Sequence, residues 1–395
     1  MYDAVVAGHL CVDITPAIDE ATALSPAFMA PGRLTEVGGV VLSTGGAVSN
    51  TGQALYKLGM DVRLIARVGD DLMAELIRGI LWRTNPEFST MPVAAKGESS
   101  SYTLVIAPPG TDRFFLHCPG TNDTFGSADI SDLFLRDTRL FHLGYPPLLR
   151  RMYADGGKEL ASIFQRAREA GATTSLDMSL PDISRPSGQA DWEAILTLTL
   201  PYVDVFLPSV EELLLMLDRA RYMELVSTVG QGGMLTALSG SEIVALADRA
   251  MELGAHIVVL KAGDRGLMVR TCGDLADIGR ATPQDAANWQ NRELWAPSFK
   301  AIVVSTAGSG DAAIAGFLAA MLHGQSIEQA ANTAAAVGAF NVEALDTLSG
   351  IRSWDETQRR IRAGWETQTV PQPAEGWVWR PATRLWHGPR DNKEQ

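Results

Sequence analysis

The sequence is poor in cysteine and in long hydrophobic runs. Its three cysteines, Cys11, Cys118 and Cys272, are odd in number and far apart, which argues against a disulfide framework and for a reducing compartment. The apolar runs at residues 312–322 and 333–340 are shorter than the roughly 18 residues that a membrane span needs. The first ten residues lack a basic region and a cleavage site, so we expect no signal peptide and a cytoplasmic protein.

Positive charge and several familiar motifs are also scarce. Lys and Arg number 33 against 46 Asp and Glu, a formal net charge of −13, so we expect no nucleic-acid partner. The sequence contains no CxxC and no HExxH, which disfavours the common zinc sites. It also contains no GxxxxGK[ST], and no GxGxxG follows the first apolar run. A Walker A loop is therefore excluded, and a dinucleotide-dependent oxidoreductase is only a weak alternative.

What the sequence does have is an alternation of short apolar runs with longer amphipathic stretches. Strands are predicted at residues 4–8, 62–68, 139–144, 173–177, 203–207 and 256–261. Helices are predicted near residues 48–58, 72–81, 153–169, 211–217 and 241–253. Apolar strands separated by helices indicate an α/β fold, with a mostly parallel sheet covered by helices on both faces. Ligands then bind at the carboxyl ends of the strands.

Three segments do not follow this alternation. Residues 16–41 contain no clear helix, and residues 101–121 are β-like with a turn at 108–110. These two segments are predicted either to pair as a small lid over the site or to be surface excursions. The segment 366–395 is rich in Pro and Trp, so we expect it to pack on the main domain, residues 1–365, or on a partner chain.

The most informative motif is a glycine-rich turn, VVSTAGSGD at residues 303–311, followed by a long apolar helix that stops at Gly324. Gly308 and Gly310 let the backbone approach a ligand, and the free N–H groups of a first helical turn bind anions. Asp311 would share that space with a phosphate, which is favourable only if it transfers a proton there. The motif thus suggests phosphoryl transfer to an alcohol; the alternative is an ordinary acidic residue at a helix N-terminus.

A second motif lies near the N-terminus. The pair Gly45-Gly46 opens a predicted helix, and Asn50 lies one turn into it. An amide offers both a donor and an acceptor, which suits a sugar hydroxyl, and Asp13 after the first strand could do the same. The alternatives are a polar residue on a helix surface for Asn50 and a turn residue for Asp13.

Together, the two motifs resemble those of the ribokinase, or PfkB-type, family of carbohydrate kinases. The N-terminal signature resembles GG…N…A…LG…VG-D and is carried by Gly45, Gly46, Asn50, Ala54, Leu58, Gly59, Val68, Gly69 and Asp70. The C-terminal signature resembles DTxGAGD-x3-AGF and is carried by Thr306, Gly308, Ser309, Gly310, Asp311, Ala315, Gly316 and Phe317. The likeness spans roughly residues 3–361 in the expected order.

The resemblance implies a ribokinase-like fold, with ATP and Mg²⁺ as cofactors and a hydroxymethyl group of a sugar as acceptor. It makes Asp311 the catalytic base and assigns the anion hole to the N–H groups of Gly308, Ser309 and Gly310. It assigns the sugar to Asp13, Gly45, Gly46 and Asn50. It assigns the nucleotide to Lys261, Gly263, Gly266, Thr306 and Asn332, and the metal to Glu212. The two extended segments, about residues 14–44 and 98–121, match the family's β-lid, so a homodimer through the lid is also expected.

The chain departs from the family pattern at three positions, all of which carry Ser. Ser209 replaces the Asn of the NxxE motif, Ser179 replaces the Asn of an Asp-x-Asn segment, and Ser305 replaces the Asp that begins the second signature. That Asp helps frame a monovalent-cation site in many members, so activation by potassium stays open. Magnesium dependence is expected nonetheless, because the ATP phosphates supply most ligands to that ion.

The leading prediction is an ATP-dependent kinase for an unphosphorylated sugar or sugar-like alcohol, because no Lys or Arg cluster lies near residues 13–50. Arg33 and Arg113, both in the expected lid, leave a sugar phosphate open. A nucleoside acceptor stays open. The alternative is a sugar- or nucleoside-binding protein that kept the fold but lost efficient catalysis, suggested by the three Ser replacements. Arg113 and His117 in the lid either reach the substrate or face solvent, and His142 is expected to be a buried, hydrogen-bonded residue.

Overall fold

The centre of the computed structural model, which describes residues 1–110 and 114–391, is a large twisted sheet. Its strand order is β15-β16-β14-β13-β12-β11-β10-β9-β1-β4. The parallel part comprises β4 (Val62–Ile65), β1 (Tyr2–Gly8), β9 (Thr138–Gly144), β10 (Thr173–Leu176), β11 (Val205–Phe206) and β12 (Ile257–Lys261). These strands confirm the predicted mostly parallel sheet.

An antiparallel extension continues the sheet beyond β12. It comprises β13 (Leu267–Thr271), β14 (Glu293–Ala296), β16 (Leu385–His387) and β15 (Val378–Arg380). The sequence pattern did not predict these strands, because the last two are only three residues long and stand in the Pro- and Trp-rich segment. That segment therefore contributes to the main sheet.

Helices cover both faces of the sheet. Successive side chains of a strand point to opposite faces, so strands that are apolar throughout have two apolar faces to bury. Val6 packs in one hydrophobic cluster and Val5 in the other, and both are fully buried. The Val6 face is covered by α2 (Ala47–Lys57), α3 (Leu72–Thr84), α13 (Ser309–Leu322) and α14 (Ile327–Asn341), with α15 (Trp354–Arg362) against α14. The Val5 face is covered by α6 (Lys158–Glu169), α8 (Trp192–Thr199), α9 (Val210–Leu217) and α11 (Gly240–Glu252).

Several predicted boundaries differ from the structure. The helix predicted at 153–169 begins only at Lys158, because Asp155 has φ 48° and the glycines after it also have positive φ. The predicted strand 62–68 divides into β4 and β5 (Arg67–Val68), which pairs with β6 (Val93–Ala94). The long helix α10 (Arg219–Ala237) was not predicted. Shorter helices are α4 (Asp132–Arg136), α5 (Arg150–Tyr153), α7 (Pro186–Gln189) and α12 (Ala286–Trp289).

The two apolar runs are buried parts of α13 and α14. Within residues 1–110 and 114–391, no helix is long and apolar enough to cross a membrane. The runs are apolar because both helices pack against the sheet and against each other.

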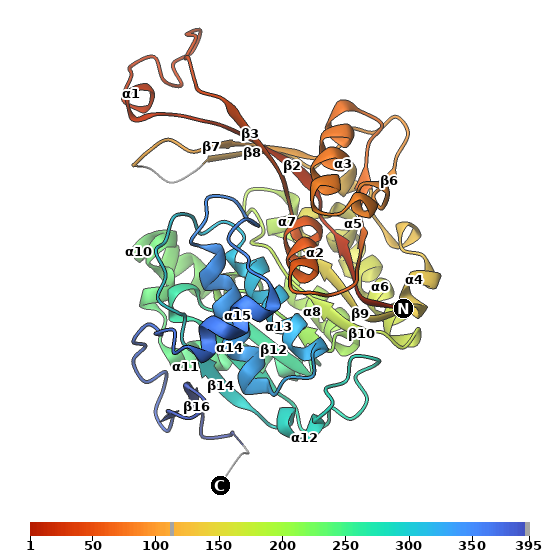
Figure 1. The fold of residues 1–395 in the computed structure, drawn as a ribbon, viewed down its shortest axis with the longest axis vertical. Coiled ribbons are helices and arrows are strands. Elements are labelled where there is room, and N and C mark those ends of the chain that lie inside the picture. Colours follow the sequence, from red (N-terminus) through yellow and green to blue (C-terminus); the bar gives the residue numbers. More distant parts are fainter. Residues whose placement is uncertain (111–113, 392–395) are drawn as a thin grey trace.

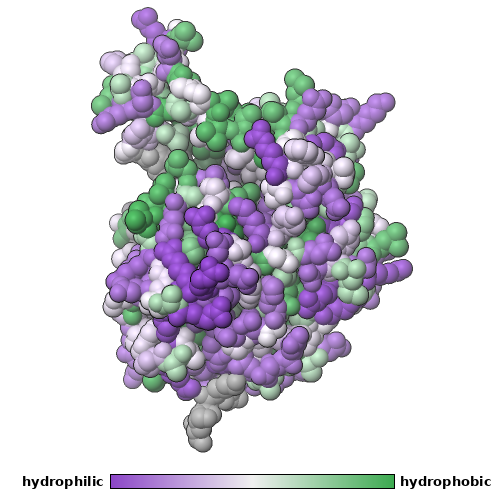
Figure 2. Space-filling model, viewed as in Figure 1, coloured by the Kyte–Doolittle hydropathy of each residue, from purple (hydrophilic) through white to green (hydrophobic). Residues whose placement is uncertain are grey.

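A second, smaller sheet projects from the body, with α1 (Glu20–Ala23) at its far end (Figure 1). Its strand order is β3 (Val40–Gly45), β2 (Cys11–Pro16), β7 (Tyr102–Ile106) and β8 (Phe114–Cys118). The two extended segments thus pair in one small sheet, as the first of the two alternatives predicted. Figure 2 shows hydrophobic side chains on this sheet, where Val41, Phe114 and Leu116 are 58%, 58% and 56% exposed.

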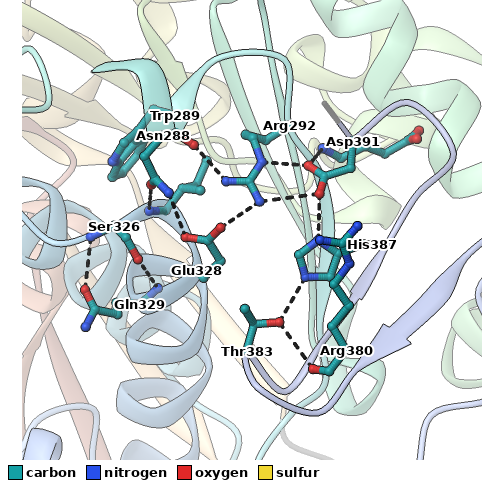
Figure 3. Close-up of polar contacts among 12 residues, drawn as sticks. Asn288, Trp289, Arg292, Ser326, Glu328, Gln329, Arg380, Thr383, His387 and Asp391 are labelled. Atoms are coloured by element: carbon teal, nitrogen blue, oxygen red, sulfur yellow. Dashed lines mark hydrogen bonds and ion pairs between the residues drawn. The ribbon is translucent and has the colours of Figure 1, made fainter. Parts of the chain in front are cut away.

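The C-terminal segment is tied to the body by a buried polar network (Figure 3). Arg292, which is 0% exposed, pairs with Asp391 at 2.6 Å and with Glu328, in the first turn of α14, at 2.7 Å. Asp391 also contacts His387 Nδ1 at 2.6 Å, and Thr383 Oγ1 lies 2.9 Å from the other ring nitrogen. Each charge in this network has an opposite or hydrogen-bonding partner, as a buried charge requires.

Candidate active site

Helix α13 presents its N-terminus to a cavity. Gly308, the residue before the helix, has φ 72°, and a Cβ there would lie 2.7 Å from the Cβ of Thr347. Only glycine combines this backbone conformation with such a close approach. The first N–H groups of a helix have no acceptor within it, and the helix dipole adds partial positive charge there. This end of the cavity can therefore hold an anion.

Asp311 lies in the first turn of α13 and is 4% exposed. Asn50 Nδ2 and the Tyr145 hydroxyl donate to its Oδ2 at 3.0 and 2.7 Å, and Thr51 Oγ1 donates to its Oδ1 at 3.3 Å. Burial raises the pKa of Asp311, while these donors and Lys261 oppose the rise. Asn50 and Asp311, which are 261 positions apart in the sequence, are thus in direct contact.

The amide of Asn50 is fixed from both ends. Its Nδ2 faces Asp311, and its Oδ1 accepts a hydrogen bond from Thr347 Oγ1 at 2.9 Å. Because Thr347 also packs against Gly308, the loop after α14 bridges the two sequence motifs. The orientation of the Asn50 amide is therefore set before any ligand binds.

The glycine pair before α2 allows two side chains to approach the backbone closely. A Cβ on Gly45 would lie 2.3 Å from Asp13 Oδ2, and a Cβ on Gly46 would lie 2.3 Å from His9 Nδ1. Gly46 also has φ 90°. Burial raises the pKa of Asp13, and Cys11 Sγ donates to its Oδ1 at 3.3 Å. These glycines make room for polar side chains beside Asn50.

The small sheet reaches the same region. His117 on β8 has its Nε2 3.5 Å from Nε2 of His9, and its Nδ1 lies 3.1 Å from Thr103 Oγ1 on β7. Burial lowers the pKa of His117, and lowers that of His9 to about 3, so both rings are neutral at pH 7. Neither ring brings positive charge to this region. The other lid residue singled out in the sequence, Arg113, lies outside the described residues.

An ion pair also lines the cavity, together with Asp311. Lys261 Nζ lies 2.7 Å from Asp177 Oδ1, and both residues are largely buried. Burial raises the pKa of Asp177, and Lys261 opposes this rise; burial lowers the pKa of Lys261, but Asp177 and Glu212 raise it more. Glu212 accepts from Ser209 N at 2.6 Å, and Ser209 Oγ accepts from Glu212 N at 3.2 Å. The Ser thus caps α9 and orients Glu212.

The cavity has a volume of about 540 Å³ and a lining of mixed chemistry. Its charged and polar lining residues include Asp177, Ser179, Glu211, Glu212, Lys261, Asp264, Ser298, Ser309 and Asp311. Its apolar lining residues include Leu235, Leu267, Phe299, Ala301, Val303, Ala334, Ala335, Ala339 and Val342, and Gln368 of the C-terminal segment also lines it. This lining suits a ligand that carries both charged and apolar groups.

The structure places most of the predicted residues in two groups; Gly308, just before α13, packs against Thr347, and Asn332 lies apart. The cavity is lined by Glu212, Lys261, Gly263, Gly266, Thr306, Ser309, Gly310 and Asp311. A second group joins Asp311 through Asn50 and includes Asp13, Gly45 and Gly46. Asn332 lies apart from both, since its Nδ2 donates to the carbonyls of Glu328 and Thr383 at 3.0 and 2.9 Å. The C-terminal segment thus occupies the amide that the resemblance assigns to the nucleotide.

Sequence reasoning missed Tyr145, Thr51, Thr347 and His9. Tyr145 follows the predicted strand 139–144, so the rule that ligands bind at the carboxyl ends of strands could have found it. Thr51 follows Asn50 in the sequence, and His9 follows the predicted strand 4–8, so the same rule could have found both regions. Thr347 lies in a loop that carries no sequence signal. His142 is buried with Nδ1 3.0 Å from Ser175 Oγ, and it does not line the cavity.

Comparisons with known proteins agree with the geometry. A model of the pfkB family carbohydrate kinases matches residues 3–353. An uncharacterized sugar kinase from Archaeoglobus fulgidus is 25% identical over 297 residues, which cover 75% of this chain and 97% of that protein.

Solved structures share the fold at low sequence identity. Arabidopsis thaliana ribokinase complexed with ribose and ATP has a TM-score of 0.66 and 17% identity, and the match covers 91% of this chain and 98% of that one. A putative ribokinase II from E. coli, in complex with ATP and Mg²⁺, has a TM-score of 0.64 and 16% identity, over 92% and 100% of the two chains. A nucleoside kinase from Methanocaldococcus jannaschii has a TM-score of 0.58 and 16% identity, over 91% and 98%. With a ribokinase-like fold and a family match along most of its length, this chain belongs to the PfkB family of carbohydrate kinases.

Proposed function

We propose that this protein transfers the γ-phosphoryl group of ATP to a hydroxymethyl group of a sugar or sugar-like alcohol. The hydroxyl oxygen forms a bond to the γ-phosphorus, and the bond from that phosphorus to the bridging oxygen of ADP breaks. Asp311 accepts the hydroxyl proton, and the N–H groups at Gly308, Ser309 and Gly310 stabilise the charge on the transferred group.

The observation that carries this proposal is the position of Asp311. It lies at the N-terminus of α13, lines a nucleotide-sized cavity beside Lys261 and Ser309, and accepts a hydrogen bond from Asn50. A carboxylate between an anion site and a polar acceptor region can receive a proton while the phosphoryl group moves. A protein that only binds sugars has no need of this arrangement.

The charged and polar residues of the cavity also fit Mg²⁺ held mainly by nucleotide phosphates. Asp177 Oδ2 and Ser179 Oγ are buried without a hydrogen-bond partner among the described residues, and both residues line the cavity with Glu212. No group of three or more His, Cys, Asp or Glu side chains in the described part of the chain forms a metal site by itself. Bound Mg²⁺ would neutralise charge on the phosphates, and Glu212 and Asp177 would hold it from the protein side.

An unphosphorylated acceptor is supported by the charges around Asn50. Among the described residues, Asp13, Asp311 and the neutral rings of His9 and His117, which surround Gly45, Gly46 and Asn50, bring no positive charge for a second phosphate. A nucleoside is the second candidate acceptor. Three rings lie together here: the ring centroid of His9 is 6.0 Å from that of Tyr145 and 5.3 Å from that of His117. Such a cluster favours a nucleoside, since flat rings pack on a base.

The small sheet supports a role as a lid that excludes water. Its strand β2 carries Asp13, and His117 on β8 contacts His9 at the end of β1. Its exposed apolar side chains further lead us to propose a homodimer through this sheet, since large exposed apolar patches mark interfaces.

The alternative, a binding protein with weakened catalysis, receives less support. Ser209 still caps α9 and keeps Glu212 in place, a role that Asn and Ser perform equally well. The Ser replacement there need not impair catalysis.

The decisive experiment replaces Asp311 by Asn and measures ATP-dependent phosphorylation across a panel of sugars, polyols and nucleosides. We expect turnover to fall by about 10²–10⁴-fold, the usual contribution of a general base, while nucleotide binding is kept. Asp355, an exposed residue in the first turn of α15, provides the matched control Asp355→Asn, which should keep full activity. A parallel reaction with a metal chelator should show no turnover.

Three outcomes would contradict the proposal in different ways. Near-normal turnover of Asp311→Asn would show that another group is the base. Full turnover with the chelator would remove Mg²⁺ from the mechanism. Tight sugar binding by the wild type without phosphorylation of any acceptor would favour the binding protein.

A further inference from the structure

Tyr145 has an unusual backbone conformation beside the proposed base. Its φ of 64° and ψ of 46° are left-handed, a region that is unfavourable for a bulky residue with a Cβ. Among the described residues, the other non-glycine residues with positive φ, Met29, Asp155, Asn291 and Arg384, do not line the cavity, whereas Tyr145 does. Unfavourable backbone of this kind persists where the surroundings determine it, and it often occurs at functional sites.

The surroundings of Tyr145 leave its backbone no alternative. Gly144 ends β9 beside Gly8 at the end of β1, and a Cβ on Gly144 would lie 2.1 Å from the Cβ of Ala47 in α2. Buried Pro146 and Pro147 follow directly and fix the backbone after the turn. This turn directs the Tyr145 hydroxyl to Asp311 Oδ2, at 2.7 Å.

The donors around Asp311 leave one direction for a substrate. An ionised carboxylate accepts about four hydrogen bonds, two on each oxygen. Asn50 and Tyr145 both donate to Oδ2, and Thr51 donates to Oδ1. The remaining position is on Oδ1, where an acceptor hydroxyl can donate its proton. Tyr145 therefore completes the set of donors that fixes the plane of the carboxylate.

The hydroxyl of Tyr145 also acts on the charge of Asp311. Burial raises the pKa of Asp311, and among the groups that oppose this rise Tyr145 has the largest effect. Burial likewise raises the pKa of Tyr145 well above its usual value, so the phenol stays protonated and remains a donor. The other titratable groups that face this pair from neighbouring elements are Lys261, Asp177, Glu212 and His9.

We propose that Tyr145 is a positioning residue for phosphoryl transfer: its hydroxyl fixes the orientation of the Asp311 carboxylate and stabilises the anion that accepts the proton. This inference rests on the proposed function, because it gives Asp311 the role of base. It adds a residue that lies outside both sequence motifs.

The test compares the wild type with Tyr145→Phe, which removes only the hydroxyl. We expect kcat to fall by about 10- to 100-fold at pH 7, the range that a hydrogen bond to a charged group supports, with the KM for ATP unchanged. Because the base must be ionised, kcat falls as pH drops through the pKa of Asp311. Loss of a donor raises that pKa, so the acid limb of the pH profile should move to higher pH in Tyr145→Phe.

A second readout does not depend on turnover. Carbon-13 NMR of protein labelled at aspartate carboxyls, with Asp311→Asn to assign the signal, follows the titration of Asp311 itself. We expect this carboxyl to titrate at higher pH in Tyr145→Phe than in the wild type. Tyr153→Phe, a change on α5 at a residue that does not line the cavity, is the matched control and should leave the signal unchanged.

The two readouts separate the failure of this inference from the failure of the proposed function. An unchanged titration of Asp311 in Tyr145→Phe overturns the inference whether or not the protein is a kinase. A higher kcat or a lower acceptor KM in this variant also overturns it, because the tyrosine would then occupy the substrate position. A shifted titration in a protein without kinase activity supports the contact between the two residues and rejects the proposed function.

Discussion

At the scale of single residues, the site depends on side chains that lie unusually close to the backbone. Asp13 fits beside Gly45 only because glycine has no side chain, since a Cβ there would lie 2.3 Å from Asp13 Oδ2. In the same way, a Cβ on Gly46 would clash with His9, and a Cβ on Gly308 would clash with Thr347. These contacts give a physical reason for the glycines of both motifs, beyond the flexibility of glycine.

Gly45→Ala should therefore damage the acceptor region selectively. The new methyl group must push Asp13 aside, so we expect the KM for the acceptor to rise by about 10-fold or more and the KM for ATP to stay unchanged. Gly79 in α3 has no atom within 4 Å of an added Cβ and no positive φ, so Gly79→Ala is the matched control. Steady-state kinetics with both substrates varied would measure the effect, and an equal rise in both KM values would contradict the assignment.

At the scale of elements, the C-terminal segment is held by a network that sequence patterns do not reveal. Strand β16 pairs with β14, and Asp391 joins Arg292 with His387 (Figure 3). The segment also places Gln368 in the cavity wall and contacts Asn332. It is thus connected both to the main sheet and to the cavity.

Asp391→Asn should destabilise the protein by about 3 kcal/mol, because it leaves the buried Arg292 with only part of its compensating charge. Although burial raises the pKa of Asp391, His387 and Arg292 lower it more, so the net shift is downward. A lowered native pKa stabilises the fold above the unfolded pKa of about 3.9, and this contribution is lost as pH falls through the native value.

Chemical unfolding at neutral pH and at pH values below about 4 would measure both effects. The difference between the wild type and Asp391→Asn should shrink as pH falls. Glu375→Gln, at an exposed residue of the same segment, is the control and should unfold like the wild type. A difference that stays constant with pH would contradict the role of the Asp391 charge.

At the scale of the whole molecule, the fold brings together motifs from the two ends of the chain. Helix α2 follows strand β3 of the small sheet, whereas α13 follows the antiparallel edge of the main sheet, and the two helices pack on the same face. The small sheet projects from the body (Figure 1), and its strand β2 follows β1 directly. Several of its apolar side chains are more than half exposed.

If the lid forms a homodimer, Leu116→Lys and Val41→Lys should shift the protein toward the monomer. Both residues are more than half exposed on the small sheet, and a buried charge in an apolar interface is unfavourable. Leu133→Lys, at a residue that is 71% exposed on α4, is the control for a charge placed elsewhere. Light scattering would measure the mass, and a wild type that is monomeric at micromolar concentration would rule out the dimer.

The sequence by itself determined the class of the fold and the two motifs, because apolar strands, amphipathic helices and glycine-rich turns are local patterns. Asp311 and Asn50 could be named from such patterns. The hydrogen bond between Asn50 and Asp311, the one from Tyr145 to Asp311 and the one from Thr347 to Asn50 could not be predicted, since each joins residues far apart in the chain. The same holds for the short strands β15 and β16, which are stabilised by pairing with β14 and by the Arg292 network rather than by their own sequence. Only the tertiary structure decided these features, because they depend on packing between distant segments, which a local pattern does not encode.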